Sequence, residues 1–147
     1  MSSPRVAAGD RIVEPLIALA GCSTRQRIVV AGAKSMELML ELKRRGYLLT
    51  ATTGNCGRPA GQYDVALVDW RRRTLLALEA ALDWIVDLLG PGAVLVVWVD
   101  AQKPAANESL RASLAKRGFV VVEGTVHDCG RGISARRLQA HPMQKAA

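Results

Sequence analysis

Short runs of β-branched and other apolar residues recur along this chain, and most are separated by segments with helical periodicity. The runs cover residues 27–31, 47–51, 63–69, 93–99 and 119–123, each bounded by Gly, Pro or polar residues. The intervening segments repeat apolar residues every three or four positions, which is typical of amphipathic helices. Strands that alternate with helices pair in parallel, so the sequence predicts a parallel sheet with helices on both faces.

Helices are predicted over residues 10–20, 35–45, 74–89 and 107–117. Proline lacks the N–H that later helical turns require, so Pro15 fits only the first turn of the first helix. Ser35 and Asn107 are residue types that cap helix N-termini. In the second helix Glu41 is expected to pair with Arg45 one turn later. Its predicted apolar face consists of Met36, Met39, Leu40 and Leu42.

The last two predicted strands, 119–123 and 133–138, are joined by a short segment with a hairpin turn at residues 128–132. So short a connection requires antiparallel strands. The predicted fold class is therefore α/β, a three-layer Rossmann-like domain with about six strands, mostly parallel, and one reversed strand at an edge.

The domain is expected to span residues 10–138, between a disordered N-terminus (1–9) and a flexible tail (139–147), because both ends are small and polar.

The chain carries a net charge of +7. A basic excess favours a phosphate-rich partner such as nucleic acid, but runs of charge more often form a solvated surface. Aromatic residues make up only 4% of the chain, which leaves few side chains to stack on bases. The basic residues cluster at Lys43–Arg45, at Arg71–Arg73, at Arg131, and at Arg136 and Arg137.

The three cysteines, Cys22, Cys56 and Cys129, are widely spaced and form no CxxC pair, and the only histidines are His127 and His141. This composition predicts no metal site and no disulfide framework. Reduced thiols are typical of a cytoplasmic protein. Charged residues interrupt the N-terminal segment, and the apolar strands are too short to span a bilayer, so we expect neither a signal peptide nor a membrane anchor.

Three stretches, taken in order and with the closing hairpin, resemble the class I S-adenosylmethionine-dependent methyltransferases. Residues 27–33 (RIVVAGA) are similar to the family's first motif. Residues 88–97 (LLGPGAVLVV) are similar to its approach to the fifth strand, and residues 114–123 (LAKRGFVVVE) to its entry into the last hairpin. The resemblance implies a transferase of Rossmann-like fold with S-adenosylmethionine as cofactor. The sequence identifies no methyl acceptor.

The sequence departs from the family's first motif, an acid followed by three spaced glycines. Gly32 stands for the first glycine, but Lys34 and Met36 take the next two positions, and Val30 replaces the acid. Glycine suits these positions because backbone approaches the cofactor closely there.

Two further departures follow the second predicted strand. The family's ribose-binding acid is replaced by Thr52 and Thr53, whose neutral hydroxyls are weaker partners than a carboxylate. The segment from Ala51 to Tyr63 is too short for the family's third strand and its helices, so we expect that strand to be missing. A loop around Asn55, Cys56 and Arg58 would take its place.

In open α/β sheets, ligands bind at the carboxyl ends of the strands where strand order switches. Here that point lies between strands 27–31 and 63–69. Free N–H groups after Gly32, together with Lys34, suit an anionic group such as a carboxylate or a phosphate. Asp100 and His127 are expected farther along the same edge. The candidate cofactor-binding residues are Ala31, Gly32, Ala33, Lys34, Thr52, Thr53, Asp69 and Trp70.

Several of these residues have a structural interpretation as well. Gly32 also suits a tight strand-to-helix turn. Asp69 is the candidate catalytic base, or it caps the next segment or pairs with Arg71–Arg73. Trp70 either stacks on a ligand or packs at a strand end. For His127, at the hairpin, a solvent-facing role is the commoner one. Methyl transfer itself mainly requires proximity and alignment.

Three functions are consistent with the sequence. The first is a small methyltransferase-like enzyme with weak or lost activity. The second is a non-catalytic methyltransferase-like module that binds a partner or itself, because helix 74–89 is apolar apart from an acidic stripe of Glu79, Asp83 and Asp87. Coverage by the N-terminal helix would explain the same pattern. The third is a receiver-like signalling domain with Asp69 as phosphoacceptor, although its first strand lacks the acidic pair that would bind magnesium.

Overall fold

The computed structural model describes residues 10–53, 61–100, 104–127 and 130–138. The predictions for residues 1–9 and 139–147, for the loop around Asn55 and Arg58, and for Cys56 and Cys129 lie outside these residues. The elements are α1 (Asp10–Ala20), β1 (Ile28–Gly32), α2 (Ser35–Arg44), β2 (Thr50–Thr52), β3 (Tyr63–Asp69), α3 (Leu75–Leu88), β4 (Leu89–Val99), α4 (Pro104–Lys116), β5 (Phe119–His127) and β6 (Gly130–Arg137).

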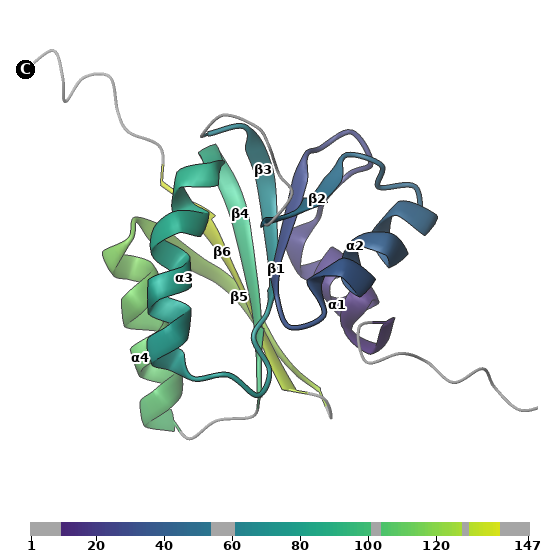
Figure 1. Cartoon of the computed structure of the whole chain (residues 1–147). Coiled ribbons are helices and arrows are strands. Elements are labelled where there is room, and N and C mark those ends of the chain that lie inside the picture. Colours follow the sequence, from purple (N-terminus) through teal and green to yellow (C-terminus); the bar gives the residue numbers. More distant parts are fainter. Residues whose placement is uncertain (1–9, 54–60, 101–103, 128–129, 139–147) are drawn as a thin grey trace, which may run out of the picture.

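The strands form one sheet in the order β2-β1-β3-β4-β6-β5 (Figure 1). The pairs β1–β2, β1–β3 and β3–β4 are parallel, and β6 runs antiparallel to both β4 and β5. The predicted Rossmann-like sheet with a closing hairpin is confirmed. Among the described residues no strand lies between β2 and β3, and β2 forms the sheet edge, as expected for a missing third strand.

The position of the reversed strand differs from the prediction. We expected it at the edge, but β6 lies inside the sheet and β5 forms the edge. The connection through α4 places β5 parallel to β4 but not next to it, with room for one strand between them. The chain then folds back as β6, which forms hydrogen bonds with β4 on one side and β5 on the other, so β5 becomes the edge strand.

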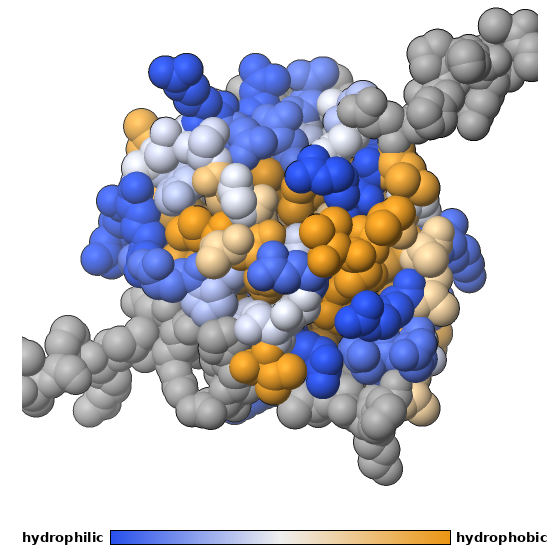
Figure 2. Space-filling model, turned by 180° about the vertical axis from the view of Figure 1, so that it is seen from behind, coloured by the Kyte–Doolittle hydropathy of each residue, from blue (hydrophilic) through white to orange (hydrophobic). Residues whose placement is uncertain are grey.

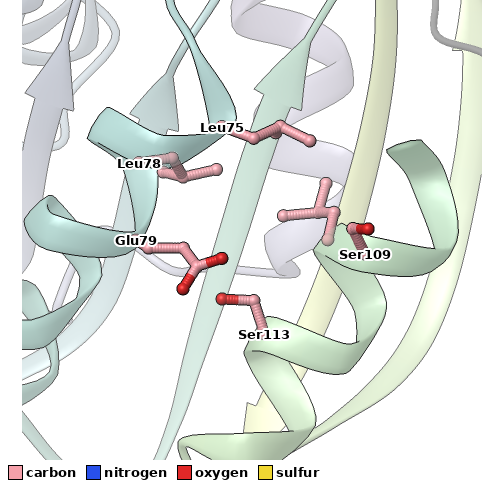
Figure 3. A pocket seen from close by; sticks show the side chains of 6 residues that line it. Leu75, Leu78, Glu79, Ser109 and Ser113 are labelled. Atoms are coloured by element: carbon pink, nitrogen blue, oxygen red, sulfur yellow. The ribbon is translucent and has the colours of Figure 1, made fainter. Parts of the chain in front are cut away.

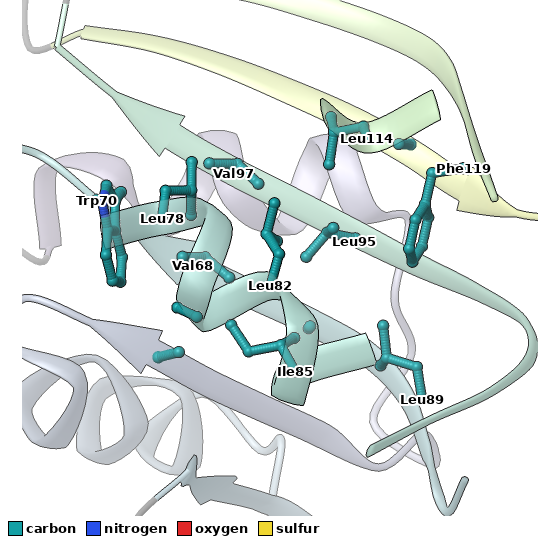
Figure 4. Close-up of a cluster of buried hydrophobic side chains, with 14 of the residues drawn as sticks. Val68, Trp70, Leu78, Leu82, Ile85, Leu89, Leu95, Val97, Leu114 and Phe119 are labelled. Atoms are coloured by element: carbon teal, nitrogen blue, oxygen red, sulfur yellow. The ribbon is translucent and has the colours of Figure 1, made fainter. Parts of the chain in front are cut away.

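Helices cover both faces of the sheet, and the central strands are apolar on both faces, as a parallel sheet requires. One buried cluster joins α3 and α4 to side chains such as Val68, Leu95 and Val97 (Figure 4). The other joins α1 and α2 to side chains such as Leu67 and Val96. The N-terminal helix α1 therefore lies on the other face of the sheet and does not cover α3. Our prediction that α1 explains the apolar composition of α3 is wrong.

An ion-pair network connects the two helices of the second face. Glu41 on α2 is nearly buried and pairs with Arg44 and Arg45, each over 2.8 Å, which confirms the predicted Glu41–Arg45 pair. Arg45 also binds Glu14 on α1. The hydrogen bond that Arg45 donates to the Glu41 carboxylate raises the pKa of Arg45, and Glu14 adds to the effect. The network therefore fixes α2 against α1.

Several predicted helix details are wrong. Pro15 lies beyond the first turn of α1, and Asn107 lies inside α4 because that helix begins at Pro104. Met36 and Leu40 are 49% and 53% exposed. The buried face of α2 consists of Leu38, Glu41 and Leu42, because the Glu41 carboxylate is neutralised by its arginines and can face inward.

Two strand boundaries also differ. The predicted strand 47–51 is replaced by β2, because residues 48 and 49 form a turn in which the Thr50 hydroxyl donates to the Tyr47 carbonyl over 2.7 Å. The α3 helix passes directly into β4 at Leu89, whereas we expected the helix to run to residue 89 and the strand to begin at residue 93. The register then jumps, so that the segment between Leu89 and Val94 bulges out of the pairing with β3.

Arginine side chains stabilise this abrupt helix-to-strand junction. Arg137 of β6 donates to the carbonyl of Val86 over 3.1 Å and to that of Leu89. The Val86 carbonyl, which also accepts the capping bond from the Leu89 N–H, thus gains a second donor at the helix C-terminus. Arg117 joins α4 to α3 through the Asp83 carboxylate at 2.9 Å.

None of the described helices is long and apolar enough to cross a membrane.

On the face turned away from Figure 1, apolar side chains gather between hydrophilic ones (Figure 2). The edge strand β5 exposes Val120, Val122 and Val126, with a register irregularity between Val121 and Glu123. Such bulges interrupt the regular hydrogen-bonding edge of a strand.

Trp98 is fully buried between β6 and α1. A Cβ on Gly132 would lie 2.5 Å from ring atoms of Trp98 and 2.7 Å from Leu19, so only glycine leaves room for the indole. The predicted hairpin turn over residues 128–132 is therefore wrong at Gly130 and Gly132, which belong to β6.

We expect Gly132→Ala to lower the free energy of unfolding by about 2–3 kcal/mol, because the added methyl overpacks the Trp98 site. Gly124→Ala is the matched control, since its Cβ would meet no atom closer than 3.6 Å. The control should change stability by less than about 1 kcal/mol. Urea unfolding of both variants measures the difference, and equal effects would contradict the packing argument.

Candidate functional site

The turn after β1 is formed by a close approach of two backbone segments. Gly32 has φ +97° and lies beside Asp69 in the parallel register of β1 and β3. The Ala33 N–H donates to the Asp69 carbonyl over 2.8 Å. A Cβ on Gly32 would lie 2.1 Å from that carbonyl oxygen and 3.2 Å from the Trp70 ring. Gly32 is thus required by the chain's own packing, which supports its interpretation as a tight strand-to-helix turn.

Lys34 continues this turn in the left-handed conformation, with φ 52° and ψ 35°. It takes the N-cap position of α2 in place of the predicted Ser35, which is the first helical residue, and it makes no side-chain capping bond. Glycine adopts the left-handed conformation most readily. The backbone at position 34 therefore has the conformation expected for a glycine of the family's motif, although the residue is Lys. The exposed Lys34 side chain adds positive charge at a helix N-terminus that no side chain caps.

Asp69, at the end of β3, is 2% exposed. Arg71 holds its carboxylate in a two-pronged ion pair, with Nη2 to Oδ2 and Nε to Oδ1 both at 2.8 Å. Such paired charge-assisted bonds are strong and fix geometry. The structure therefore favours the pairing role over that of a catalytic base. A buried, engaged carboxylate is also unsuited to accept a phosphoryl group, and the receiver-like alternative is wrong in fold because β6 is antiparallel.

Trp70 is 6% exposed and belongs to the core cluster (Figure 4). Its indole N–H donates to the Thr74 carbonyl over 2.8 Å, and its backbone N–H donates to the Trp98 carbonyl over 2.7 Å. The Arg73 guanidinium lies 5.0 Å from its ring centroid. Packing is therefore the role that the structure supports for Trp70.

The turn from β3 to α3 is coupled to the end of β4. Arg72 has φ +64°, and its backbone N–H donates to Asp100 Oδ2 over 2.6 Å. Asp100 therefore lies beside the Asp69 segment, although we expected it farther along the edge. The sequence did not predict this bond, because it requires Arg72 in the left-handed conformation, which a bulky residue rarely adopts.

The predicted site residues on neighbouring strands come together at the carboxyl-terminal ends of β1, β2 and β3. Thr52 pairs with Val30 in register at the end of β2 and is 6% exposed, and Thr53 follows it half-buried. Ala31 pairs with Val68 one position before Gly32. His127 ends β5, the outermost strand on the side of the sheet away from β2. The intervening strands therefore separate its backbone from the other candidates.

Two hollows lie away from the strand ends. A small cleft between α3 and α4 has Glu79 and Ser113 facing each other across it (Figure 3). The Ser113 hydroxyl accepts a hydrogen bond from Arg117 over 2.7 Å. A wider groove of about 370 Å³ separates Glu14 on α1 from Glu123 on β5. Among the described residues no cluster of His, Cys, Asp or Glu could hold a metal ion.

We expect Gly32→Ala to lower the free energy of unfolding by about 3–4 kcal/mol, the sum of a left-handed backbone penalty and a steric clash. Gly21→Ala is the matched control, because Gly21 has φ +60° but open space around its Cβ position. The control should lose only about 1 kcal/mol. Chemical denaturation distinguishes the two, and similar losses would contradict the proposed close approach.

A comparison with protein-family models finds no match, and a comparison with curated protein sequences finds none either. Solved structures do match. A methyltransferase from Methanosarcina mazei, described as S-adenosylmethionine-dependent, has a TM-score of 0.67 at 13% identity, over 86% of this chain and 98% of that one.

The 1,6-didemethyltoxoflavin-N1-methyltransferase of Burkholderia thailandensis, solved with bound 1,6-didemethyltoxoflavin and S-adenosylhomocysteine, has a TM-score of 0.59 at 16% identity, over 90% of this chain and 79% of that one. The [4+2]-cyclase SpnF has a TM-score of 0.63 at 13% identity, over 88% of this chain and 82% of that one. The fold of this chain is therefore the Rossmann-like fold of the class I methyltransferases.

Proposed function

We propose that this methyltransferase-like protein binds S-adenosylmethionine at the carboxyl ends of β1, β2 and β3. One observation carries the proposal. The tight turn at Gly32 and the left-handed residue at Lys34 lead into an uncapped helix N-terminus at the point where strand order switches. Ligands of open α/β sheets bind at such points, and helix N-termini bind anionic groups.

The residues fit the two ends of this cofactor unequally. The methionyl carboxylate matches the N–H groups at the start of α2 and the ammonium of Lys34. The ribose would meet the hydroxyls of Thr52 and Thr53, since no carboxylate follows β2 in the described chain up to Thr53. Loss of a charged acceptor weakens binding by about tenfold to a hundredfold, so we expect modest affinity.

The cofactor would supply an electrophilic methyl group on a sulfonium, and this reaction depends mainly on alignment of donor and acceptor. Because Arg71 already holds Asp69, we assign that carboxylate a positioning role at the strand end. The chain's contribution would be to bind and orient the two substrates. We also propose a cytoplasmic location, on the basis of its cysteine usage.

A second candidate function is a non-catalytic methyltransferase-like module. It is favoured by the replacement of two motif glycines with Lys34 and Met36 and by the engaged Asp69. The match to a structure described as a cyclase supports the view that one fold serves several functions.

Isothermal calorimetry with S-adenosylmethionine and S-adenosylhomocysteine tests the proposal. We expect binding in the micromolar range, weakened about tenfold by Lys34→Glu, because that change places a negative charge beside the cofactor carboxylate. Lys43→Glu is the matched control, since Lys43 is also an exposed lysine and lies near the other end of α2. Its affinity should stay within about twofold of the wild type, because charges a helix length away are largely screened.

The result distinguishes the two functions. Absence of heat at millimolar cofactor would reject the cofactor site and favour the binding module. Equal weakening by both lysine substitutions would indicate a general charge effect and remove Lys34 from the site.

A further inference from the structure

Three consecutive arginines lie between the end of β3 and Thr74, the N-cap residue of α3. A helix N-terminus carries a partial positive charge, so acidic side chains are favourable there and cations are not. The first turn of α3 contains no acidic residue, yet Arg71, Arg72 and Arg73 precede it directly. Positive charge is thus concentrated at the carboxyl end of β3, beside the candidate cofactor site.

The chain itself neutralises only part of this charge. The Arg71 guanidinium binds both carboxylate oxygens of Asp69, each over 2.8 Å. Arg72 and Arg73 are exposed, and in the described part of the chain neither guanidinium forms an ion pair. Asp100 accepts a hydrogen bond from the backbone N–H of Arg72, not from its side chain. Two guanidinium groups at this turn are therefore available to a ligand.

Arg72 also contradicts the preference of its own backbone. Its φ of +64° lies in the left-handed region, which glycine adopts readily and a bulky residue rarely does. A glycine here would relieve both the backbone strain and the repulsion between neighbouring arginines. Residues held in such conformations are concentrated at ligand sites, so this outlier favours a binding role for Arg72.

Trp70 holds the side chain of Arg73 in place. The guanidinium lies 5.0 Å from the centroid of the indole ring, and a Cβ on Gly32 would lie 3.2 Å from the same ring. A stacked guanidinium keeps its N–H groups in its own plane, where they can bind an oxyanion through two parallel hydrogen bonds. The stack therefore places an ordered cation beside the turn that Gly32 and Lys34 form.

An independent observation comes from Arg131 in β6. It pairs with Val99 of β4, so both side chains lie on the face of the sheet that α3 and α4 cover. Val99 directly precedes Asp100, to which the Arg72 backbone is bonded. The Arg131 Nε atom is buried and has no hydrogen-bond partner among the described residues. Buried donors are almost always satisfied, so this one points to an acceptor that the described chain does not supply.

We propose that the methyl acceptor of this protein is a small molecule with a phosphate group, which Arg72, Arg73 and Arg131 bind at the carboxyl ends of β3 and β4. The inference rests on the proposed function, because only a methyltransferase makes this second ligand an acceptor. A phosphate matches several guanidinium groups better than a carboxylate does, since it offers about two negative charges and three oxygens. A polynucleotide is disfavoured because Trp70, the aromatic residue of this turn, is buried and cannot stack on a base.

Calorimetry with inorganic pyrophosphate, with and without saturating S-adenosylhomocysteine, tests the site. We expect a dissociation constant of about 0.1–1 mM in both cases, because the two ligands use different residues. Arg73→Gln and Arg131→Gln should each weaken binding about tenfold through loss of charge-assisted hydrogen bonds. Arg25→Gln is the matched control, since Arg25 is exposed near the amino end of β1. Its affinity should stay within about twofold of the wild type.

Arg72→Gly separates a binding role from a structural one. Glycine suits the backbone at this position, so the variant should unfold at the same urea concentration as the wild type or a higher one. Its affinity for pyrophosphate should nevertheless fall about tenfold. Unchanged affinity would overturn the role of Arg72.

The outcomes separate this proposal from the proposed function. Binding of S-adenosylhomocysteine without binding of pyrophosphate at about 10 mM would overturn the phosphate site alone. Binding of pyrophosphate without S-adenosylhomocysteine would overturn the acceptor assignment together with the cofactor site. Equal weakening by Arg25→Gln would overturn the site as a general charge effect. Tighter binding of citrate or of a single-stranded oligonucleotide, lost in Arg73→Gln, would overturn the choice of a small phosphate ligand.

Discussion

The contact between the backbones of Gly32 and Asp69 is the constraint on which the candidate site depends. It allows β1 to end directly against β3, so that the turn into α2 begins within hydrogen-bonding distance of the Asp69 carbonyl. From Asp69 the chain continues through the Arg71 ion pair and the bond from Arg72 to Asp100. One close approach therefore orders the carboxyl ends of β1 and β3 and couples them to the end of β4, which is where ligands bind in this class of sheet.

Arginine accounts for many of the contacts between layers, and this changes how the basic composition is interpreted. Arg45 joins α2 to α1, Arg117 joins α4 to α3, and Arg137 binds carbonyls at the end of α3. Arg71 neutralises Asp69. Residues from three of the predicted basic clusters thus serve the fold, since a planar guanidinium can satisfy several acceptors at once. The clusters are consequently weaker grounds for a nucleic-acid partner than their sequence suggested.

Sequence patterns predicted the features that depend on neighbours along the chain. Strands β1, β3 and β4 were recognisable because their runs are apolar on both faces, and the pairing of Glu41 with Arg45 followed from helical spacing. Details that depend on distant contacts were missed. Met36 and Leu40 match the period of a buried face, yet both are exposed, and α2 buries Leu38, Glu41 and Leu42 instead. Gly132 looked like a turn residue, whereas it makes room for Trp98.

The sequence by itself determined the fold class, the closing hairpin and, within the described residues, a sheet without a strand between β2 and β3, because periodicity and segment length are local properties. Only the tertiary structure decided how the site residues are used. Whether Asp69 is a free base or an ion-pair partner depends on the position of Arg71, and whether Trp70 stacks or packs depends on α3. The left-handed backbone at Lys34 has the same origin, since packing of the turn against β3 overrides the preference of the residue.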